Sequence, residues 1–525
     1  MIPPRWSGRR KISYYRNKLA VQVHPARNNQ RDMAPAHVLV FPWPLQGHIN
    51  CMLHFAAGLV GAGLHVTFLH TEHNLARVDP LASAAATPRL RFVSVPDGLP
   101  AGHPRTVRDL KEPLLTTVPA AYRALLASLQ QQPSTTADAG FPPVSCVVAD
   151  GLLPFAIDIP EEEFGVPALA FRTVSACSIL AYLSVPRLVE LGEAIPIPLD
   201  ADLDELVLGV PGMEGFLRRR DLPSPCRVNA ETQEADPLLD MIVDFTAHSR
   251  DKARALILNT AASLEGESLA HIAEQMRGDV FAIGPLHLHA AANVSSSSSS
   301  PAPVASGSMW REDGGCIEWL DAQGDRSVVY VSLGSLTVIS LEQFTEFLSG
   351  LVGAGHAFLW VLRPDMVTAT QNALLREAVD AAAALHGNAA PAAFVVDWAP
   401  QRAVLRHRAV GCFLTHAGWN STVECAAEGV PMVCWPFFAD QQINSRFVGA
   451  VWGTGLDMKD VCDRAVVEAM VREAMESAGI RRSAVALAER VRRDVEEGGS
   501  SAVEFDRLVG FIKELAATKD SVANQ

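Results

Sequence analysis

The sequence predicts an α/β protein with two doubly wound, parallel-sheet domains that face each other across a cleft. Three observations support this fold class. The chain has 525 residues, which is more than a single hydrophobic core usually covers. Short apolar runs rich in β-forming residues alternate with helical periods in both halves of the chain. A serine- and proline-rich stretch between the two halves marks a domain junction.

The first domain opens with a strand, a helix and a second strand. The apolar run 37–42 is followed by a helical period at 49–60 and by another apolar run at 64–69. Strands that are connected through a helix in this way are parallel. Further apolar runs at 144–149 and 167–171 continue the alternation. We therefore expect a doubly wound sheet in this half.

The same alternation resumes after the low-complexity stretch and predicts a second open sheet. Its strands are expected at 327–333, 357–362, 393–396, 410–414 and 431–435. After residue 463 the pattern is helical to about residue 517, and Gly498 and Gly499 mark a break before the final helix.

These patterns divide the chain into five parts. We expect a basic extension at 1–32, a first domain at 33–285, an interdomain linker at 286–312, a second domain at 313–495 and a final helix at 496–525. The extension carries eight Lys or Arg residues and lacks the apolar core of a secretory signal, so we place it outside the fold. It is either a transit peptide or an extended start upstream of an initiator at Met33.

Composition and charge exclude several classes of partner. The net charge of −14 repels nucleic acids and anionic membrane surfaces. The sequence has no stretch of about 18 uncharged apolar residues, so we expect no membrane span. Nine scattered cysteines without a C-x-x-C pair are typical of reduced thiols in a cytoplasmic protein, rather than of disulfides or a zinc site. We expect the protein to be a monomer.

The most informative motif follows the predicted strand 410–414. That strand runs into Thr415-His-Ala-Gly-Trp-Asn-Ser-Thr422, which opens a helix. A small, glycine-containing turn at a helix start exposes free backbone N–H groups at the positive end of the helix dipole, and such a site suits a pyrophosphate. If the helix begins near His416, that residue, Asn420 and Glu424 form a polar line along one helix face.

The far end of this polar line offers a carboxylate. A carboxylate beside a diphosphate must accept hydrogen bonds from uncharged donors, and the hydroxyls of a ribose are such donors. Glu424 is therefore the candidate ribose ligand. The alternative is an exposed helix face with incidental polar residues, which the spacing alone does not exclude.

A candidate base lies in the loop after the first strand, at the end of Phe41-Pro-Trp-Pro-Leu-Gln-Gly-His48. This loop lies at the carboxyl edge of the sheet, where open α/β folds bind ligands. A neutral imidazole at His48 could take the proton of an acceptor hydroxyl, although a lone histidine is more often structural. Asp150 ends another parallel strand and could orient the His48 ring; alternatively, it caps the next helix.

Thirteen residues between Trp398 and Gln441 resemble the signature box of plant secondary-product UDP-glycosyltransferases. They are Trp398, Pro400, Gln401, His416, Gly418, Trp419, Asn420, Ser421, Glu424, Pro431, Pro436, Asp440 and Gln441. The resemblance extends from Ala36 to the C-terminus and implies the GT-B architecture of two Rossmann-like domains. It also implies that the donor binds mostly to the C-terminal half, and the acceptor to an apolar pocket of the N-terminal half.

The resemblance implies a role for each polar residue of the box. Trp398 stacks on the uracil, and the backbone of Gln401 reads the edge of the base. His416, Asn420 and Ser421 hold the diphosphate.

The other residues of the box belong, by the same resemblance, to the ribose and the sugar. Glu424 binds the ribose, Asp440 and Gln441 bind sugar hydroxyls, and Trp419 belongs to the same UDP-sugar site. A glutamine at the last position is associated with glucose, which implies UDP-glucose as the donor.

Outside the box, His48 and Asp150 match the catalytic dyad of the family, Ser335 resembles a second phosphate contact, and Thr173 resembles a residue near the sugar. The resemblance implies that His48 takes the acceptor proton while UDP leaves from the opposite face of the sugar, which gives a β-glucoside. The helix N-terminus stabilises the leaving diphosphate, so we expect no metal cofactor.

The acceptor is less well defined. The segments 171–177, 211–213 and 220–223 resemble the branch of the family that acts on terpenoid, iridoid and cyanohydrin aglycones, while flavonoids and other phenolics stay open. Two other classes of protein are alternatives. A nicotinamide oxidoreductase would need Gly-x-Gly-x-x-Gly between a strand and a helix, which the sequence lacks. A catalytically silent binding protein would be expected to lose His48 or Asp150, and both are present.

Overall fold

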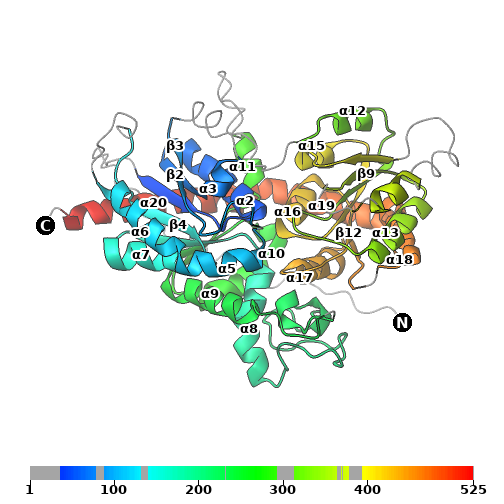
Figure 1. The fold of residues 1–525 in the computed structure, drawn as a ribbon, viewed down its shortest axis with the longest axis horizontal. Coiled ribbons are helices and arrows are strands. Elements are labelled where there is room, and N and C mark those ends of the chain that lie inside the picture. Colours follow the sequence, from blue (N-terminus) through cyan, green and yellow to red (C-terminus); the bar gives the residue numbers. More distant parts are fainter. Residues whose placement is uncertain are drawn as a thin grey trace. The chain divides into compact units, whose positions relative to one another are not determined.

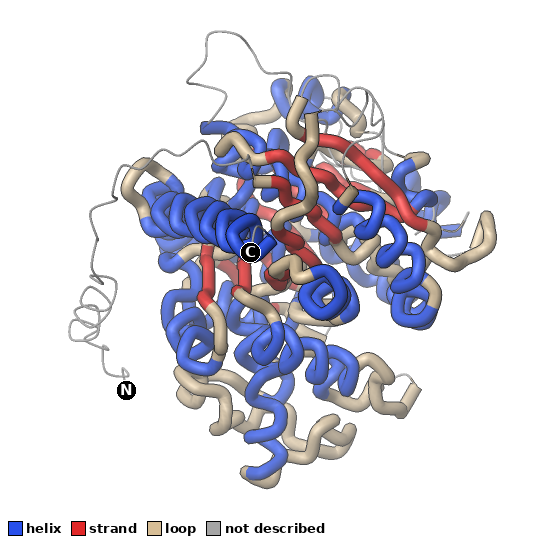
Figure 2. Tube along the Cα trace, turned by 90° about the vertical axis from the view of Figure 1, so that its left-hand side faces the viewer, coloured by secondary structure: helices blue, strands red, loops and turns tan. Residues whose placement is uncertain are grey.

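The computed structural model describes residues 36–77, 88–103, 105–131, 140–230, 232–292, 312–363, 368, 370–377, 393–460 and 462–523. The expected extension 1–32 and most of the expected linker, residues 293–311, lie outside the described residues. The described chain forms two α/β halves, each around one parallel sheet, and both halves belong to one compact unit (Figure 1). Figure 2 shows the strands of the sheets with helices around them.

The N-terminal half contains a seven-stranded sheet with the order β3-β2-β1-β4-β5-β6-β7, in which all neighbours are parallel. The strands are β1 (His37–Phe41), β2 (His65–Thr71), β3 (Leu90–Val95), β4 (Cys146–Asp150), β5 (Ala168–Arg172), β6 (Ala255–Leu258) and β7 (Asp279–Ala282). The order of the strands reverses between β1 and β4, where Phe41 lies opposite Ala149. The loops that follow two such strands diverge and leave room for a ligand.

Helices cover both faces of this sheet. They are α2 (Gln46–Gly61), α3 (Glu72–Leu75), α5 (Val107–Thr116), α6 (Val118–Gln130), α7 (Phe155–Phe164), α8 (Ala176–Glu190), α9 (Leu239–Lys252), α10 (Ala262–Gln275), α11 (Leu286–Ala292) and, from the end of the chain, α20 (Ser500–Ala523). In β1, Leu39 and Phe41 pack into the core on the side of α6, α7 and α8, whereas Val38 and Val40 pack on the side of α2 and α20. Strands buried on both faces read as continuous apolar runs.

The C-terminal half contains a six-stranded parallel sheet with the order β10-β9-β8-β11-β12-β13. Its strands are β8 (Val328–Ser332), β9 (Ala357–Val361), β10 (Ala393–Val396), β11 (Val410–Thr415), β12 (Met432–Cys434) and β13 (Gly455–Asp457), and its helices include α12 (Gly315–Asp321), α13 (Leu341–Gly353), α15 (Gln401–Arg406), α16 (Trp419–Glu428), α17 (Gln441–Arg446), α18 (Arg464–Glu476) and α19 (Ala478–Val495). The order reverses between β8 and β11, which places a second switch point in this half.

Every strand predicted from the sequence is present, with ends that shift by at most two residues. Four further strands, β3, β6, β7 and β13, do not stand out in the sequence. Strands β6, β7 and β13 contain only three or four residues, so they are too short to show a period. Strand β3 lies at the edge of its sheet and is mostly half-buried.

The final helix belongs to the N-terminal half of the fold, although it ends the chain. The Phe505 ring of α20 lies on α2 so closely that a Cβ added at Gly58 would be 2.9 Å from Phe505 Cζ. Arg507 pairs with Asp279 of β7 at 3.0 Å. Helix α11 occupies the first residues of the expected linker and packs on α2. None of the described helices is both long enough and apolar enough to cross a bilayer.

Candidate active site

The two residues expected to form a dyad meet at the switch point of the N-terminal sheet. His48 lies in the first turn of α2, just after β1, and Asp150 is the last residue of β4. Because β1 and β4 are neighbours, their following loops bring the two side chains together. His48 Nδ1 is 2.6 Å from Asp150 Oδ2. Because Nδ1 faces Asp150, Nε2 is the ring nitrogen that is left to contact the hydroxyl of an acceptor substrate.

Asp150 is held as a carboxylate behind the His48 ring. Its side chain is 1% exposed, whereas that of His48 is 20% exposed. Burial acts to raise the pKa of Asp150, but the charge and hydrogen bond of His48, the Arg172 cation and the amide of Leu152 together hold that pKa below its ordinary value. The Leu152 amide donates to Oδ1 at 3.0 Å and the Trp43 amide to Oδ2 at 3.4 Å. An anionic Asp150 can fix the ring and stabilise its protonated form.

Thr173 also contacts the His48 ring. Its Oγ1 lies 2.9 Å from Nδ1, directly after β5. The family resemblance implies a place near the sugar for Thr173, and the structure places its hydroxyl against the candidate base. Because β4 and β5 are paired, Thr173 lies at the same carboxyl edge of the sheet as Asp150.

The glycine-containing turn of the C-terminal half leads into α16. This helix begins at Trp419, three residues later than the start near His416 that would align three polar residues on one helix face. Ala417 adopts a left-handed conformation with φ of 61°, and Gly418 is extended. Neither conformation continues a helix. His416 therefore lies in the loop before α16, whereas Asn420 and Glu424 lie on the helix.

The His416 ring is enclosed by two glycines. A Cβ added at Gly334 would lie 2.5 Å from His416 Nε2, and one added at Gly418 would lie 2.4 Å from the same atom. Only glycine permits such an approach. Burial lowers the pKa of His416 to about 4, so the ring is neutral at physiological pH. Ser335 follows Gly334 and lines the same cavity.

Glu424 belongs to a group of hydrogen-bonded side chains beside α16. Gln401 Nε2 donates to Glu424 Oε2 at 2.8 Å and to Ser421 Oγ at 3.1 Å. The hydroxyl of Tyr330 donates to Gln401 Oε1 at 3.3 Å. Burial raises the pKa of Glu424, while the hydrogen bond from Gln401 acts in the opposite direction. Trp398 is half-buried and lines the cavity beside this group.

Two residues at the start of α16 contact the N-terminal half. Asn420 Nδ2 donates to the carbonyl of Gly47 at 2.8 Å. Trp419 is buried, and its indole N–H donates to the carbonyl of Asn259 at 2.9 Å. The indole of Trp419 therefore serves as a contact between the halves, in addition to its place on the cavity wall.

Asp440 and Gln441 lie at the start of α17 and are both buried. Gln441 Oε1 accepts hydrogen bonds from the amides of Phe437 at 2.8 Å and Phe438 at 3.1 Å. Its carboxamide is thereby oriented, with the nitrogen as the remaining donor. Asp440 Oδ2 accepts from Asn444 Nδ2 at 3.0 Å, and burial raises the pKa of Asp440.

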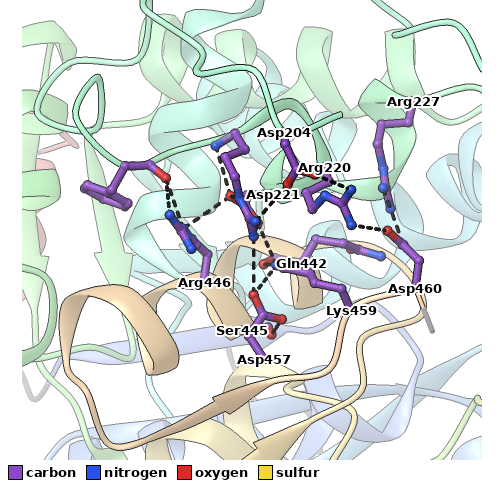
Figure 3. Close-up of polar contacts among 12 residues, drawn as sticks. Asp204, Arg220, Asp221, Arg227, Gln442, Ser445, Arg446, Asp457, Lys459 and Asp460 are labelled. Atoms are coloured by element: carbon purple, nitrogen blue, oxygen red, sulfur yellow. Dashed lines mark hydrogen bonds and ion pairs between the residues drawn. The ribbon is translucent and has the colours of Figure 1, made fainter. Parts of the chain in front are cut away.

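A cluster of buried charges holds the loop after α8 to the C-terminal half (Figure 3). Asp221 is completely buried, and its carboxylate contacts Arg218 Nε at 2.9 Å, Lys459 Nζ at 2.8 Å and Arg446 Nε at 3.3 Å. Burial acts to raise the pKa of Asp221, but the hydrogen bond from Arg218 and the charge of Lys459 keep it below its ordinary value. Lys459 also pairs with Asp457 at 3.0 Å.

The same loop forms hydrogen bonds to the residue that precedes Asp440. Ser224 donates its amide to the carbonyl of Ala439 at 3.0 Å and accepts the Ala439 amide on Oγ at 2.8 Å. Ala439 has φ of 57°, a left-handed conformation that is unfavourable for alanine. The loop after α8 belongs to the N-terminal half. Through Ser224 and the Asp221 cluster it therefore helps to position Asp440 and Gln441 of the C-terminal half.

Most of the expected site residues surround one cavity of about 1120 Å³, whereas the Asp221 cluster lies outside its lining. Of the expected site residues, the cavity is lined by His48, Ser335, Trp398, Gln401, His416, Trp419, Asn420, Ser421, Glu424, Asp440 and Gln441, whereas Asp150 lies behind His48. Among the described residues no three His, Cys, Asp or Glu side chains are grouped so that they could hold a metal ion. Arg172 and Tyr182 also line the cavity, although neither was among the site residues expected from the sequence. Arg172 is a charged residue at the end of an apolar strand, and this pattern could have identified it as a candidate site residue.

Comparisons with known proteins identify the family of this chain. A family model described as UDP-glucoronosyl and UDP-glucosyl transferase matches residues 312–489. A myricetin 3-O-rhamnoside 1,2-glucosyltransferase from Crocosmia x crocosmiiflora is 43% identical over 92% of this chain and 97% of that protein. A 7-deoxyloganetic acid glucosyl transferase from Catharanthus roseus is 42% identical over 93% of this chain and 99% of that protein.

The fold also matches solved structures. The crystal structure of Os79 from O. sativa in complex with UDP has a TM-score of 0.73 and 27% identity, and covers 90% of this chain and 100% of that chain. Identity above 40% over nearly the whole length of curated relatives is sufficient to assign the family. The chain therefore belongs to the plant UDP-glycosyltransferases and is a UDP-glycosyltransferase with two Rossmann-like domains in the GT-B arrangement.

Proposed function

We propose that this enzyme is an inverting, UDP-glucose-dependent O-glucosyltransferase that forms β-glucosides of small, largely apolar acceptors. The observation that carries the proposal is the hydrogen-bonded pair of His48 and Asp150, which faces the start of α16 across one cavity. Asn420 ties the two sides together through its bond to the Gly47 carbonyl. A base for the acceptor hydroxyl and a diphosphate site in the same cavity suit the transfer of a sugar from the diphosphate to the acceptor.

In this proposal the C-terminal half, residues 313–495, binds the donor. Trp398 stacks on the uracil and Glu424 binds the ribose, with Gln401 beside both. The half-buried position of Glu424 next to the Gln401 amide supports a role as an acceptor of uncharged donors.

The diphosphate lies at the start of α16 in this proposal. His416, Asn420 and Ser421 contact it together with the free amides of the helix, and Ser335 contacts it from the loop after β8. Because His416 is neutral, it acts as a hydrogen-bond donor, and the helix N-terminus supplies the positive potential. These groups stabilise the leaving UDP in the place that a metal ion would otherwise take.

The sugar lies between α17 and His48. Asp440 and Gln441 bind its hydroxyls, and the oriented carboxamide of Gln441 supports the choice of glucose. His48 Nε2 takes the acceptor proton as the acceptor oxygen attacks the anomeric carbon from the face opposite UDP. Asp150 orients the ring and stabilises the imidazolium that forms. The α-linked donor thus becomes a β-glucoside.

The N-terminal half, residues 33–285, holds the acceptor. Apolar side chains of α5 and α9, such as Val107, Met241 and Ile242, line the same cavity as His48 and support an apolar aglycone. The two curated relatives are named for an iridoid acid and a flavonol glycoside. We therefore propose terpenoid or iridoid acceptors first, with cyanohydrin and phenolic acceptors as the other candidates.

The test uses protein that starts at Met33 and protein that starts at Met1, each incubated with UDP-glucose and a panel of hydroxylated terpenoids, cyanohydrins and phenolics. Mass spectrometry reports hexose addition, and the proton spectrum of the product reports the anomeric configuration. The His48→Ala variant should lose at least about a hundredfold in rate while it still binds UDP. No binding of any UDP-sugar would contradict the proposed donor site, and an α-glucoside would contradict the inverting mechanism.

A further inference from the structure

The wall of the cavity contains a buried arginine that the proposed reaction does not use. Arg172 is the last residue of β5, directly before Thr173, and lines the cavity although it is only 3% exposed. Its side chain crosses Gly151, where an added Cβ would be 2.6 Å from Arg172 Cδ. The glycine after Asp150 therefore makes room for the arginine.

The guanidinium of Arg172 lacks an anionic partner among the described residues. Its one hydrogen bond is a long one, from Nη2 to Thr246 Oγ1 at 3.5 Å, and Nη1 is buried without any hydrogen bond. Asp150 and Asp440 are near enough to interact with its charge, but no carboxylate of the described chain forms an ion pair with it. A buried, unpaired cation is costly. Such a group is therefore expected to have a partner that the chain itself does not supply.

A second unused donor lies on the same wall. Tyr182 of α8 is 3% exposed and lines the cavity, and its hydroxyl forms no hydrogen bond with the described residues. Burial raises the pKa of Tyr182 well above its ordinary value, so the hydroxyl stays protonated and can donate. Tyr182 and Arg172 line the same cavity, and the charge of Arg172 acts on the Tyr182 hydroxyl.

We propose that Arg172 and Tyr182 form a subsite for a carboxylate on the acceptor, so that the preferred acceptors are small apolar hydroxy acids. This inference rests on the proposed function and names its substrate class. A planar guanidinium and a phenol hydroxyl match the two oxygens of a carboxylate. The hydroxyl of the same acceptor reaches His48, because Arg172, Tyr182 and His48 line one cavity and Thr173, the residue after Arg172, contacts the His48 ring. A carboxylate on the acceptor gives this buried cation the anionic partner that the described chain does not supply.

The carboxylate is assigned to the acceptor rather than to the donor sugar. Arg172 packs on Gly151 and on Thr246 of α9, both of which belong to the N-terminal half. The proposed ligands of the donor sugar, Asp440 and Gln441, belong to the C-terminal half.

The experiment measures binding, so that it does not depend on turnover. Calorimetry compares 7-deoxyloganetic acid with its methyl ester on the parent chain, with and without saturating UDP. The acid should bind the parent at least about tenfold more tightly than the ester, as a charge-assisted contact requires. Arg172→Met should remove this preference and leave the affinity for the ester within about twofold. Arg172→Lys should retain part of the preference, and Tyr182→Phe should reduce it.

Arg108→Met is the matched control, because Arg108 lines the same cavity but is exposed. It should leave the preference for the acid unchanged. The inference is overturned if the parent does not prefer the acid, if Arg172→Met weakens acid and ester alike, or if the preference follows Arg108. If Arg172→Met does not fold by circular dichroism, Arg172→Lys and Tyr182→Phe decide by the same criterion. Failure of UDP to bind would contradict the proposed function instead, since acid and ester can still be compared without UDP.

Discussion

Asn420 at the start of α16 donates a hydrogen bond of 2.8 Å to the carbonyl of Gly47, the residue that precedes His48. One side chain therefore connects the proposed diphosphate site with the proposed base. The two residues are 373 positions apart in the chain. Any change at Asn420 is expected to act on donor binding and on the position of His48 together.

Asn420→Asp is the sharpest test of this connection. The variant keeps the shape of the side chain but replaces the N–H donor with an anion beside the proposed diphosphate. We expect the affinity for UDP to fall by at least about tenfold, since a charge-assisted contact is lost and a repulsion is introduced. Titration of UDP against tryptophan fluorescence measures this. An unchanged affinity would contradict the placement of the diphosphate at the start of α16.

Asp150→Asn should separate catalysis from donor binding. The neutral amide cannot stabilise a protonated His48, so we expect kcat to fall by about 10²–10⁴-fold, in the range of general-base contributions. The UDP affinity should change by less than about twofold, because Asp150 lies behind His48 and outside the lining of the proposed nucleotide site. A loss of UDP affinity with little change in kcat would contradict the role of Asp150.

Gly334→Ala tests the close approach of the glycine to His416. Gly334 has φ of 79°, and an added Cβ would be 2.5 Å from His416 Nε2. The matched control is Gly355→Ala, where φ is 75° and nothing lies within 4 Å. Each variant should lose about 1–2 kcal/mol of unfolding free energy from the left-handed backbone. Only Gly334→Ala should also weaken UDP binding, because it displaces the His416 ring.

Asp221→Asn should destabilise the contact between the loop after α8 and the C-terminal half. Removing one partner of a buried ion pair leaves a charge uncompensated, and we expect the free energy of unfolding to fall by about 3 kcal/mol. Asp457 still contacts Lys459, which limits the loss. Asp460→Asn is the control, since Asp460 is 42% exposed and should contribute at most about 1 kcal/mol. Urea unfolding at pH 7 compares the three proteins.

The Asp221 contribution should also depend on pH in a defined direction. The pKa of Asp221 in the folded chain lies below its ordinary value of 3.8. Its stabilising contribution is therefore complete above that ordinary value and is lost as the pH falls through the lower, folded pKa. The difference between the parent and Asp221→Asn should persist from pH 7 to about pH 4 and shrink below it. A difference that instead grows toward low pH would contradict the assignment.

The sequence alone determined the fold class and the position of the donor segment. Strands such as β1, β4, β8 and β11 are buried on both faces, so they appear as continuous apolar runs between helical periods. The glycine-containing turn before α16 is a local feature of the chain, and its proposed role as an anion site rests on local backbone geometry. A helix start near His416 was one possibility from the sequence; the left-handed conformation of Ala417, which the sequence does not reveal, delays the start of α16 to Trp419.

Only the tertiary structure decided which of these residues meet. His48 and Asp150 are 102 positions apart, and their bond depends on the adjacency of β1 and β4 in the sheet. The hydrogen bonds from Asn420 to Gly47 and from Ala439 to Ser224 depend on how the two halves pack against each other. The burial of the unpaired Arg172 depends on how helices pack within the N-terminal half. Local propensity and periodicity report on neighbours in sequence, whereas these contacts are set by the packing of distant segments.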